Sequence, residues 1–444
     1  MTKMSVTFIL LAFLVTTVSM AANKKVFPYK ARTEVLSNGL KVIMIPMQTK
    51  GSLAYYTVVR TGSRDEYEPD HSGFAHFFEH MMFRGTKKYP GNVYDKIITS
   101  IGADANAYTS DDITCFHLKI ASEDLEKVME LESDRFQNLW YPEREFQTES
   151  GAVYGEYRKS KTSPYFLLEE KMNETAFDVH TYKHTTMGFE KDIAAMPTMY
   201  DYSRSFFKRY YRPENCVLLI VGDFDQSKTL GLIRNYYGNW KKGYQTPPVT
   251  QEPEQKTERN SSVKYSGKTL PILTLAYKSP AYNPEDRTAL AGSLLSELAF
   301  GDNSDVFKKL YLKEQKVQSI MTDFGNNRDP YLWVINAQIK SESDINYIKN
   351  ELSAAIDYFK TSLVTLHKLD ALKKKIKYQF LMNLDTPDKV AGSLARTIAI
   401  TGGIDAVDKF YATLEKISPE DIKTAANKYF AVEKRTVVTL SGSK

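Results

Sequence analysis

The sequence predicts an α+β protein of two related domains, each a sheet with helices packed on it. Apolar strand-like runs alternate with helix-like stretches in both halves of the 444 residues, a length that exceeds what one hydrophobic core usually supports. The chain also repeats itself loosely. Met196-Pro197 leads through a helix-like stretch to an apolar run that ends at Gly222. Ile417-Ser418-Pro419 leads in the same way to a run that ends at Gly442, which indicates a duplicated unit.

The first predicted element is a secretory signal peptide over residues 1–22. An early lysine precedes an apolar run from Val6 to Val18, and Ser19-Met20-Ala21 follows it. The run is shorter than the roughly 20 residues that span a bilayer, so a retained anchor is the weaker interpretation. We expect cleavage near Ala21 or Ala22 and a secreted or periplasmic product without a stable membrane span.

A change in composition separates the two predicted domains. Between residues 244 and 265, Pro, Gln, Glu, Ser and Thr replace the periodic apolar pattern, as in an interdomain linker. The first domain is therefore predicted over 23–243 and the second over 266–444. The formal net charge of +5 is mild and the charges are interspersed, so nucleic acid is not indicated as a partner.

The chain has two cysteines, and each lies inside a strand-like run. An exported protein could join Cys115 and Cys216 in a disulfide, but two buried free thiols are an equally good interpretation. They do not form a metal-binding pair.

The run His76-Phe77-Phe78-Glu79-His80 is the strongest chemical signal in the chain. On a helix, residues four apart lie one turn apart on one face, so both imidazoles can reach one ion. Glu79 projects toward the same face and could take a proton from a metal-bound water. The spacing predicts a catalytic zinc site of the inverted type, and a helix with incidental histidines is the alternative.

A catalytic zinc usually has three protein ligands and one open position, so one ligand remains to be found. Glu149 and Glu156 lie seven residues apart, close to two helical turns, which places both on one face of a predicted helix. One could bind the ion while the other orients a ligand or the water. Spacing alone leaves a solvated helix face as the alternative.

These motifs give the chain a specific resemblance. It resembles the pitrilysin and insulinase family of zinc metallopeptidases, and in particular its short two-domain bacterial members and mitochondrial processing peptidase subunits. The N-terminal half matches nearly end to end, whereas the C-terminal half matches in pattern more than in motif. The matching segments are Leu36–Leu40, Thr61–Arg64, Gly73–Thr86, Asn106–Thr109, Glu149–Arg158, His180–Tyr182 and Gly188–Phe189.

The resemblance implies a role for each residue near the metal. His76, His80 and Glu156 occupy the zinc-ligand positions, for one zinc ion per chain. Glu79 occupies the general-base position. Glu149 occupies the position of a second acidic residue that supports the metal helix without binding the ion.

The resemblance also implies how substrate binds and how the chain assembles. Asn106 and Ala107 lie where the family has an edge strand, against which an extended peptide is laid as an added strand. Each domain is expected to hold a mostly antiparallel sheet, and the chain to form half of a clam-like chamber. We therefore expect a homodimer or a heterodimer with a related chain.

The sequence departs from the family in its second half. Many active members carry there an Arg and a Tyr that help hold substrate, and neither is recognisable in the segment Ser304–Ser319. We expect a zinc endopeptidase that hydrolyses extended peptides or small proteins after export, with Glu79 as general base. The alternatives are a metal-bearing subunit that is inactive alone and a non-catalytic binding subunit. A structural zinc module is a third class, but such modules fill four positions with Cys and His.

Overall fold

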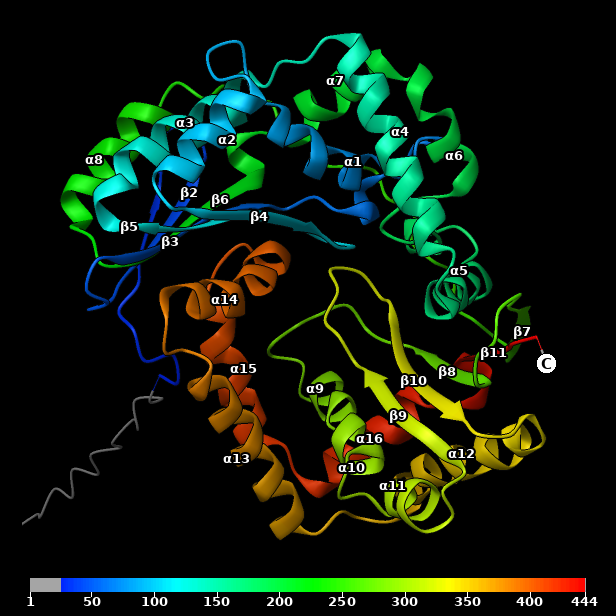
Figure 1. Ribbon diagram of the computed structural model, residues 1–444. Helices are drawn as coiled ribbons and strands as arrows, with labels where there is room; N and C mark the ends of the chain where they lie inside the picture. The colour runs from blue at the N-terminus through cyan, green and yellow to red at the C-terminus, as the bar shows by residue number, and fades with distance from the viewer. Residues whose placement is uncertain (1–24, 444) are drawn as a thin grey trace, which may run out of the picture.

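The computed structural model describes residues 25–443 and shows two halves, each built on one β-sheet (Figure 1). The first sheet lies within residues 32–222 and the second within residues 259–441. The predicted signal peptide and its cleavage point lie outside the described residues. Among the described helices, none combines the length and the apolar character that crossing a bilayer requires.

The first sheet has six strands in the order β1-β2-β6-β3-β5-β4, so β4 is an edge strand. Neighbouring strands are antiparallel except β2 and β6, which are parallel. The strands are β1 (Arg32–Val35), β2 (Lys41–Pro46), β3 (Ser52–Val59), β4 (Asp104–Thr109), β5 (Thr114–Ala121) and β6 (Cys216–Gly222).

The second sheet has five strands in the order β7-β11-β8-β10-β9, and its one parallel pair is β7 with β11. Without β1, the first sheet has the same order and the same directions. The prediction of two related, mostly antiparallel domains is confirmed. The strands are β7 (Arg259–Lys264), β8 (Ile272–Lys278), β9 (Val317–Asp323), β10 (Leu332–Ile339) and β11 (Arg435–Ser441).

Except for α5, the helices of the first half cover one face of the first sheet (Figure 1). Side chains along β3 alternate between the two faces of the sheet, and both faces are buried. Tyr55 and Val59 enter the core under these helices, while Tyr56 and Val58 enter the core on the opposite face. The helices are α1 (Phe74–Met81), α2 (Gly91–Ser100), α3 (Leu125–Asn138), α4 (Glu143–Ser160), α5 (Pro164–Ala176), α6 (Glu190–Ala195), α7 (Tyr200–Tyr210) and α8 (Gln226–Tyr237).

The helices of the second half begin at clear sequence signals. Thr386 caps α14 with its side chain and is followed by proline, and Ser418 forms a capping box at the start of α16. The helices are α9 (Arg287–Ser293), α10 (Leu295–Phe300), α11 (Asp305–Phe307), α12 (Ile345–Thr361), α13 (Leu366–Met382), α14 (Pro387–Thr401), α15 (Asp405–Lys416) and α16 (Pro419–Tyr429), and residues 308–313 continue α11 as a π-helical turn.

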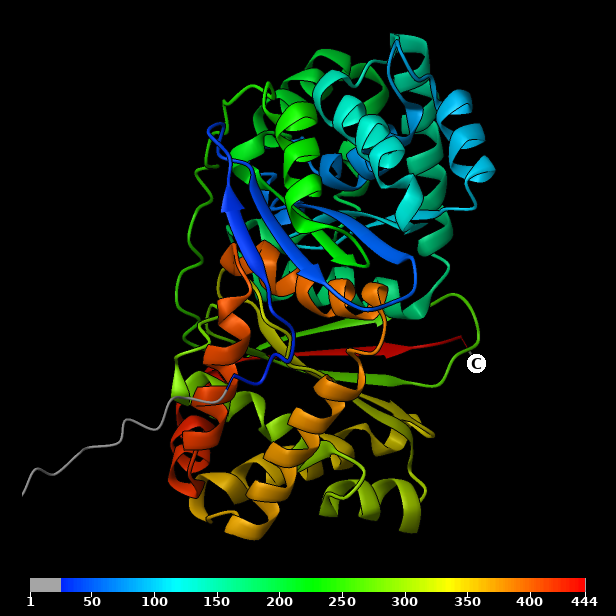
Figure 2. The ribbon, with the colours of Figure 1, turned by 90° about the vertical axis from the view of Figure 1, so that its left-hand side faces the viewer.

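The two halves exchange one helix each. α14 packs on β3 and β6 of the first sheet, and α5 packs on β7 and β11 of the second. Figure 2 shows the orange segment that contains α14 against the blue strands of the first sheet. Leu394 of α14 and Leu168 of α5 are buried in these contacts. Each half therefore completes the apolar core of the other.

The linker extends over fewer residues than the sequence predicts. The chain has no helix or strand between α8 and Arg259, but β7 then occupies residues 259–264 and pairs in parallel with β11. The predicted linker of 244–265 is wrong at this end. β7 is an edge strand with alternating exposure and polar side chains, so its composition resembles that of a linker.

The two cysteines are free and buried. Cys115 lies on β5 and Cys216 on β6, and β3 runs between these two strands. Two strand spacings amount to roughly 9.6 Å, beyond the reach of a disulfide. The side chains also enter different cores, so the interpretation as two free thiols is confirmed.

Candidate functional site

Helix α1 carries the histidine motif and is held firmly in the first domain. Phe74, Phe77, Phe78 and Met81 are buried in the core below it. The predicted helix and its shared face are therefore present, and the face turned away from the core carries the polar residues of the motif. His76 is only 9% exposed, so its imidazole is largely shielded from water.

Helix α4 lies against α1 and brings the two carboxylates of the sequence prediction to the histidines (Figure 1). The Nε2 atom of His80 lies 3.4 Å from Glu156 Oε2, and the Nε2 atom of His76 lies 3.9 Å from Glu156 Oε1. One ligand atom from each of the three residues lies within 4.8 Å of the others. The structure thus assembles His76, His80 and Glu156 into one potential metal site.

The donor atoms fit a zinc ion. Zinc–nitrogen and zinc–oxygen bonds of about 2.0–2.1 Å in a tetrahedral site place ligand atoms about 3.3–3.4 Å apart, close to the spacing at His80 and Glu156. Burial, and then the charge of His80, lower the pKa of His76 to about 4. His76 is therefore neutral near pH 7, which is the form that binds a metal.

Glu149 does not join the three ligand atoms but holds one of the ligands. Its Oε1 accepts a hydrogen bond of 2.9 Å from His80 Nδ1, and its Oε2 accepts from Arg84. A donor proton on Nδ1 leaves the Nε2 lone pair of His80 free to face a metal. The bond to Glu149 is the largest cause of the raised pKa of His80.

Glu79 lies beside the potential metal site without belonging to its ligand set. Its Oε2 accepts a hydrogen bond of 2.6 Å from the hydroxyl of Thr109, at the end of β4. Burial raises the pKa of Glu79, against the opposing effects of Thr109 and His80. A cavity of about 350 Å³ opens here, and its lining comprises Glu79, His80, Phe83, Arg84, Asp95 and Glu149.

Asn106 and Ala107 lie on β4, the edge strand nearest to α1 in the first sheet. They pair with His117 and Phe116 of β5 on the inner side. Among residues 25–443 no strand pairs with the outer side of β4. An extended peptide could therefore add to this edge beside Glu79.

Sequence reasoning assigned no role to Thr109 or Arg84, although both contact residues of the predicted site. Both lie in segments that carry the family resemblance, but no local spacing links them to Glu79 or Glu149. The second-half segment Ser304–Ser319 forms α11, the π-helical turn and the start of β9, where Gln318 is exposed.

Fold and site together define a class of protein. Two domains share one topology, and the first alone carries the inverted His-x-x-Glu-His helix, with a carboxylate from a second helix at the histidines. This combination is typical of an inverted-zincin peptidase.

Comparison with known proteins identifies the family within this class. Residues 41–190 match the family "Insulinase (Peptidase family M16)", and residues 199–376 match "Peptidase M16 inactive domain". Over 421 residues the chain is 30% identical to the zinc protease PqqE of Helicobacter pylori, covering 93% of each chain. The chain belongs to the insulinase family, M16, in its two-domain bacterial form.

Solved structures agree with this assignment. A crystal structure of a protease from Helicobacter pylori is similar with a TM-score of 0.87 and 28% identity, over 93% of this chain and 99% of that one. The first half of the periplasmic protease PqqL from Escherichia coli has a TM-score of 0.75 at 19% identity, over 93% of this chain and 92% of that one. The second likeness supports the fold alone.

Proposed function

We propose that this chain is a zinc-dependent endopeptidase that hydrolyses extended peptides or small proteins after export. The convergence of His76, His80 and Glu156 beside the carboxylate of Glu79 supports this proposal most directly. Bound zinc would activate a water molecule and polarise the scissile carbonyl. The name of the relative, zinc protease PqqE, supports zinc as the ion, and the single ligand cluster supports one ion per chain.

The residues of the chain would perform the remaining steps. Main-chain pairing with β4 at Asn106 and Ala107 would align an extended peptide without reading its side chains. Glu79 would accept a proton from the attacking water and return it to the leaving amine. Glu149 would hold His80 in the orientation that leaves Nε2 free. No covalent intermediate is needed.

The chemistry of the cluster disfavours a purely structural metal. Structural zinc sites generally have four Cys or His ligands, whereas this cluster contains two histidines, one glutamate and no cysteine. A subunit that only binds peptides is the second candidate function, because β4 would hold a peptide with or without Glu79. Such a subunit would bind zinc and peptide without hydrolysis.

The Glu79→Gln variant tests the proposal. The amide keeps the size of the side chain but cannot accept the proton, and proton transfer of this kind typically contributes 10²–10⁴-fold to rate. Peptide hydrolysis by purified wild-type chain should fall by that range in the variant, while zinc content stays near one per chain.

Glu143→Gln is a matched control, because Glu143 is exposed at the start of α4. It should hydrolyse at the wild-type rate. Full hydrolysis by Glu79→Gln would remove Glu79 from the base role. A zinc-loaded wild-type chain that hydrolyses no peptide, either alone or mixed with a related partner chain, would favour the binding subunit.

A further inference from the structure

The turn between β4 and β5 joins the candidate base to the half of the molecule that has no histidine motif. Thr109 is the last residue of β4 and donates the 2.6 Å hydrogen bond to Glu79. Ser110, Asp111, Asp112 and Ile113 follow directly and form the turn. Because Thr109 is covalently attached to this turn, the position of the turn sets the position of the hydroxyl at Glu79.

The first half holds this turn from one side. The amide of Ser63 donates to the carbonyl of Ser110, and the amide of Arg64 donates to the carbonyl of Asp111 over 2.9 Å. Gly62 permits this close approach, since a Cβ atom there would lie 2.1 Å from the Ser110 carbonyl oxygen. Any larger residue at position 62 would push the turn away.

The second half holds the turn from the other side, through Ser110, Asp111 and Asp112. Asn327 Nδ2 donates to Asp111 Oδ2 over 3.2 Å. The Arg328 amide donates to Asp112 Oδ2 over 3.0 Å, and its guanidinium donates to the Asp112 carbonyl over 3.1 Å. Arg396 of α14 donates to Ser110 Oγ over 3.1 Å.

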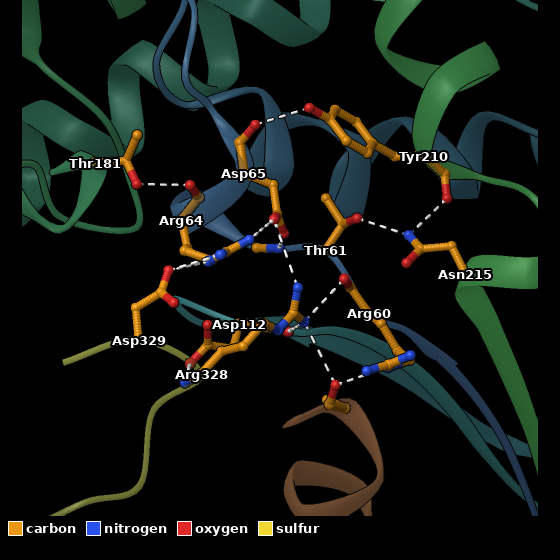
Figure 3. Close-up of polar contacts among 12 residues, drawn as sticks. Arg60, Thr61, Arg64, Asp65, Asp112, Thr181, Tyr210, Asn215, Arg328 and Asp329 are labelled. Atoms are coloured by element: carbon orange, nitrogen blue, oxygen red, sulfur yellow. Dashed lines mark hydrogen bonds and ion pairs between the residues drawn. The ribbon is translucent and has the colours of Figure 1, made fainter. Parts of the chain in front are cut away.

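The loop that makes these contacts is itself fixed. Figure 3 shows Arg328 reaching toward Arg60 and Asp65, while Asp329 meets Arg64. Asn327 is only 3% exposed, so its amide cannot exchange this partner freely for water. The contacts therefore form an ordered connection between the β9–β10 loop and the β4–β5 turn.

We propose that the second half acts as a clamp on the β4–β5 turn and, through Thr109, positions the carboxylate of Glu79. The inference rests on the proposed function, since it needs Glu79 as the base. Asn327 and Arg396 are positioning residues that act through Thr109. Loss of positioning can cost about 10²-fold in rate, which gives the clamp a measurable effect.

Steady-state hydrolysis of a peptide by the zinc-loaded full chain tests the clamp. Thr109→Val keeps the shape of the side chain but removes the donor, and kcat should fall about 10-fold or more. Thr109→Ser restores the hydroxyl and should recover most of kcat. Arg396→Gln removes the guanidinium contact to the turn and should lower kcat more than it changes KM, with zinc still near one per chain.

The double variant separates the clamp from a general weakening of the fold. If Arg396 acts through Thr109, adding Arg396→Gln to Thr109→Val should lower kcat little further, because coupled residues are not additive. Lys41→Met is the matched control. Lys41 also bridges the halves, by donating to the Gly402 carbonyl, but it does not contact the turn. This variant should keep the wild-type kcat.

The outcomes distinguish the two proposals. A zinc-loaded wild-type chain that hydrolyses no peptide, either alone or mixed with a related partner chain, overturns the proposed function and the clamp with it. An active wild-type chain whose Thr109→Val and Arg396→Gln variants keep full kcat overturns the clamp alone. Multiplying effects in the double variant, or an equal loss in Lys41→Met, also overturn it.

Discussion

At the residue scale, the imidazole of His80 lies between two carboxylates of α4, those of Glu149 and Glu156. Glu149 accepts from its Nδ1, and Glu156 lies at its Nε2. The ring thus has one fixed side and one side available to a metal. The two glutamates lie seven residues apart on one helix, yet the structure gives them different partners and therefore different chemical roles.

Zinc content should separate these roles. Removal of a direct ligand strips the ion, so Glu156→Gln should purify with little zinc. Removal of a residue that only orients a ligand typically costs about 10–100-fold in metal affinity or activity, so Glu149→Gln should keep zinc at saturating concentrations and hydrolyse slowly. Elemental analysis and peptide assays measure both. The reverse pattern would exchange the two assignments.

Local sequence revealed only part of this site. His76, Glu79 and His80 lie on one helix, so the helical period alone predicts that they share a face. The partners of Glu79 and Glu149 are different, because Thr109 and Arg84 lie 30 and 65 residues away from them along the chain. Such contacts depend on how β4 and α4 pack against α1, which no local pattern encodes.

At the element scale, the exchange of α5 and α14 links the two halves. Apolar periodicity indicates that a helix buries one face, but it does not say which sheet that face covers. β7 was missed for a related reason, since an exposed, polar edge strand has no apolar period. The sequence therefore predicts the fold class and the duplication, whereas the pairing of elements across the halves comes only from the structure.

Loss of the α14 contact should destabilise the first domain and the second together. Leu394 is fully buried between α14 and the first sheet. Truncation of such a leucine costs about 2–5 kcal/mol, so Leu394→Ala should lower the free energy of unfolding by that amount. Leu366→Ala is the matched control, because Leu366 is 65% exposed and its loss should cost at most about 0.5 kcal/mol. Urea denaturation measures both, and equal effects would contradict the buried role.

At the scale of the whole molecule, Asp329 makes the contact between the halves sensitive to acid. Burial raises the pKa of Asp329, but the hydrogen bond from His180 and the charge and hydrogen bond of Arg64 outweigh it and lower the pKa to about 2. An unfolded aspartate titrates near about 3.9. The ionised Asp329 carboxylate therefore stabilises the folded chain above about pH 4, and this stabilisation is lost as pH falls toward 2.

The Asp329→Asn variant should be less stable than the wild type by a constant amount between about pH 7 and 5. The difference should shrink between about pH 4 and 2, where the wild type also loses the charge. Denaturation midpoints across this range measure it. Asp405→Asn removes an exposed pair with Lys409 and should have little effect at any pH. A difference that grows in acid would contradict the role of Asp329.

The family resemblance implies an Arg and a Tyr that help hold substrate in the segment Ser304–Ser319, and neither is recognisable there, because Tyr311 stands at the Arg position and Gln318 at the Tyr position. Two arginines of the second half reach the first half, but both already donate hydrogen bonds. Arg328 donates to the carbonyl of Asp112, and Arg396 donates to Ser110 Oγ and to the carbonyl of Asn326. These two arginines therefore cannot replace the missing substrate contacts without releasing the β4–β5 turn.

We therefore predict that the chain alone is a poor peptidase, and that a related exported chain without His-x-x-Glu-His supplies the missing contacts. A peptide aligned only by β4 would reach attack geometry rarely, at a cost of about 10²-fold or more. Adding that partner should raise hydrolysis by a similar factor, and native mass spectrometry should show a heterodimer with one zinc ion. A monomer or homodimer, identified by light scattering, that already turns over peptides at about 1–10³ per second would show that the chain needs no different partner, because such rates are ordinary for complete enzymes.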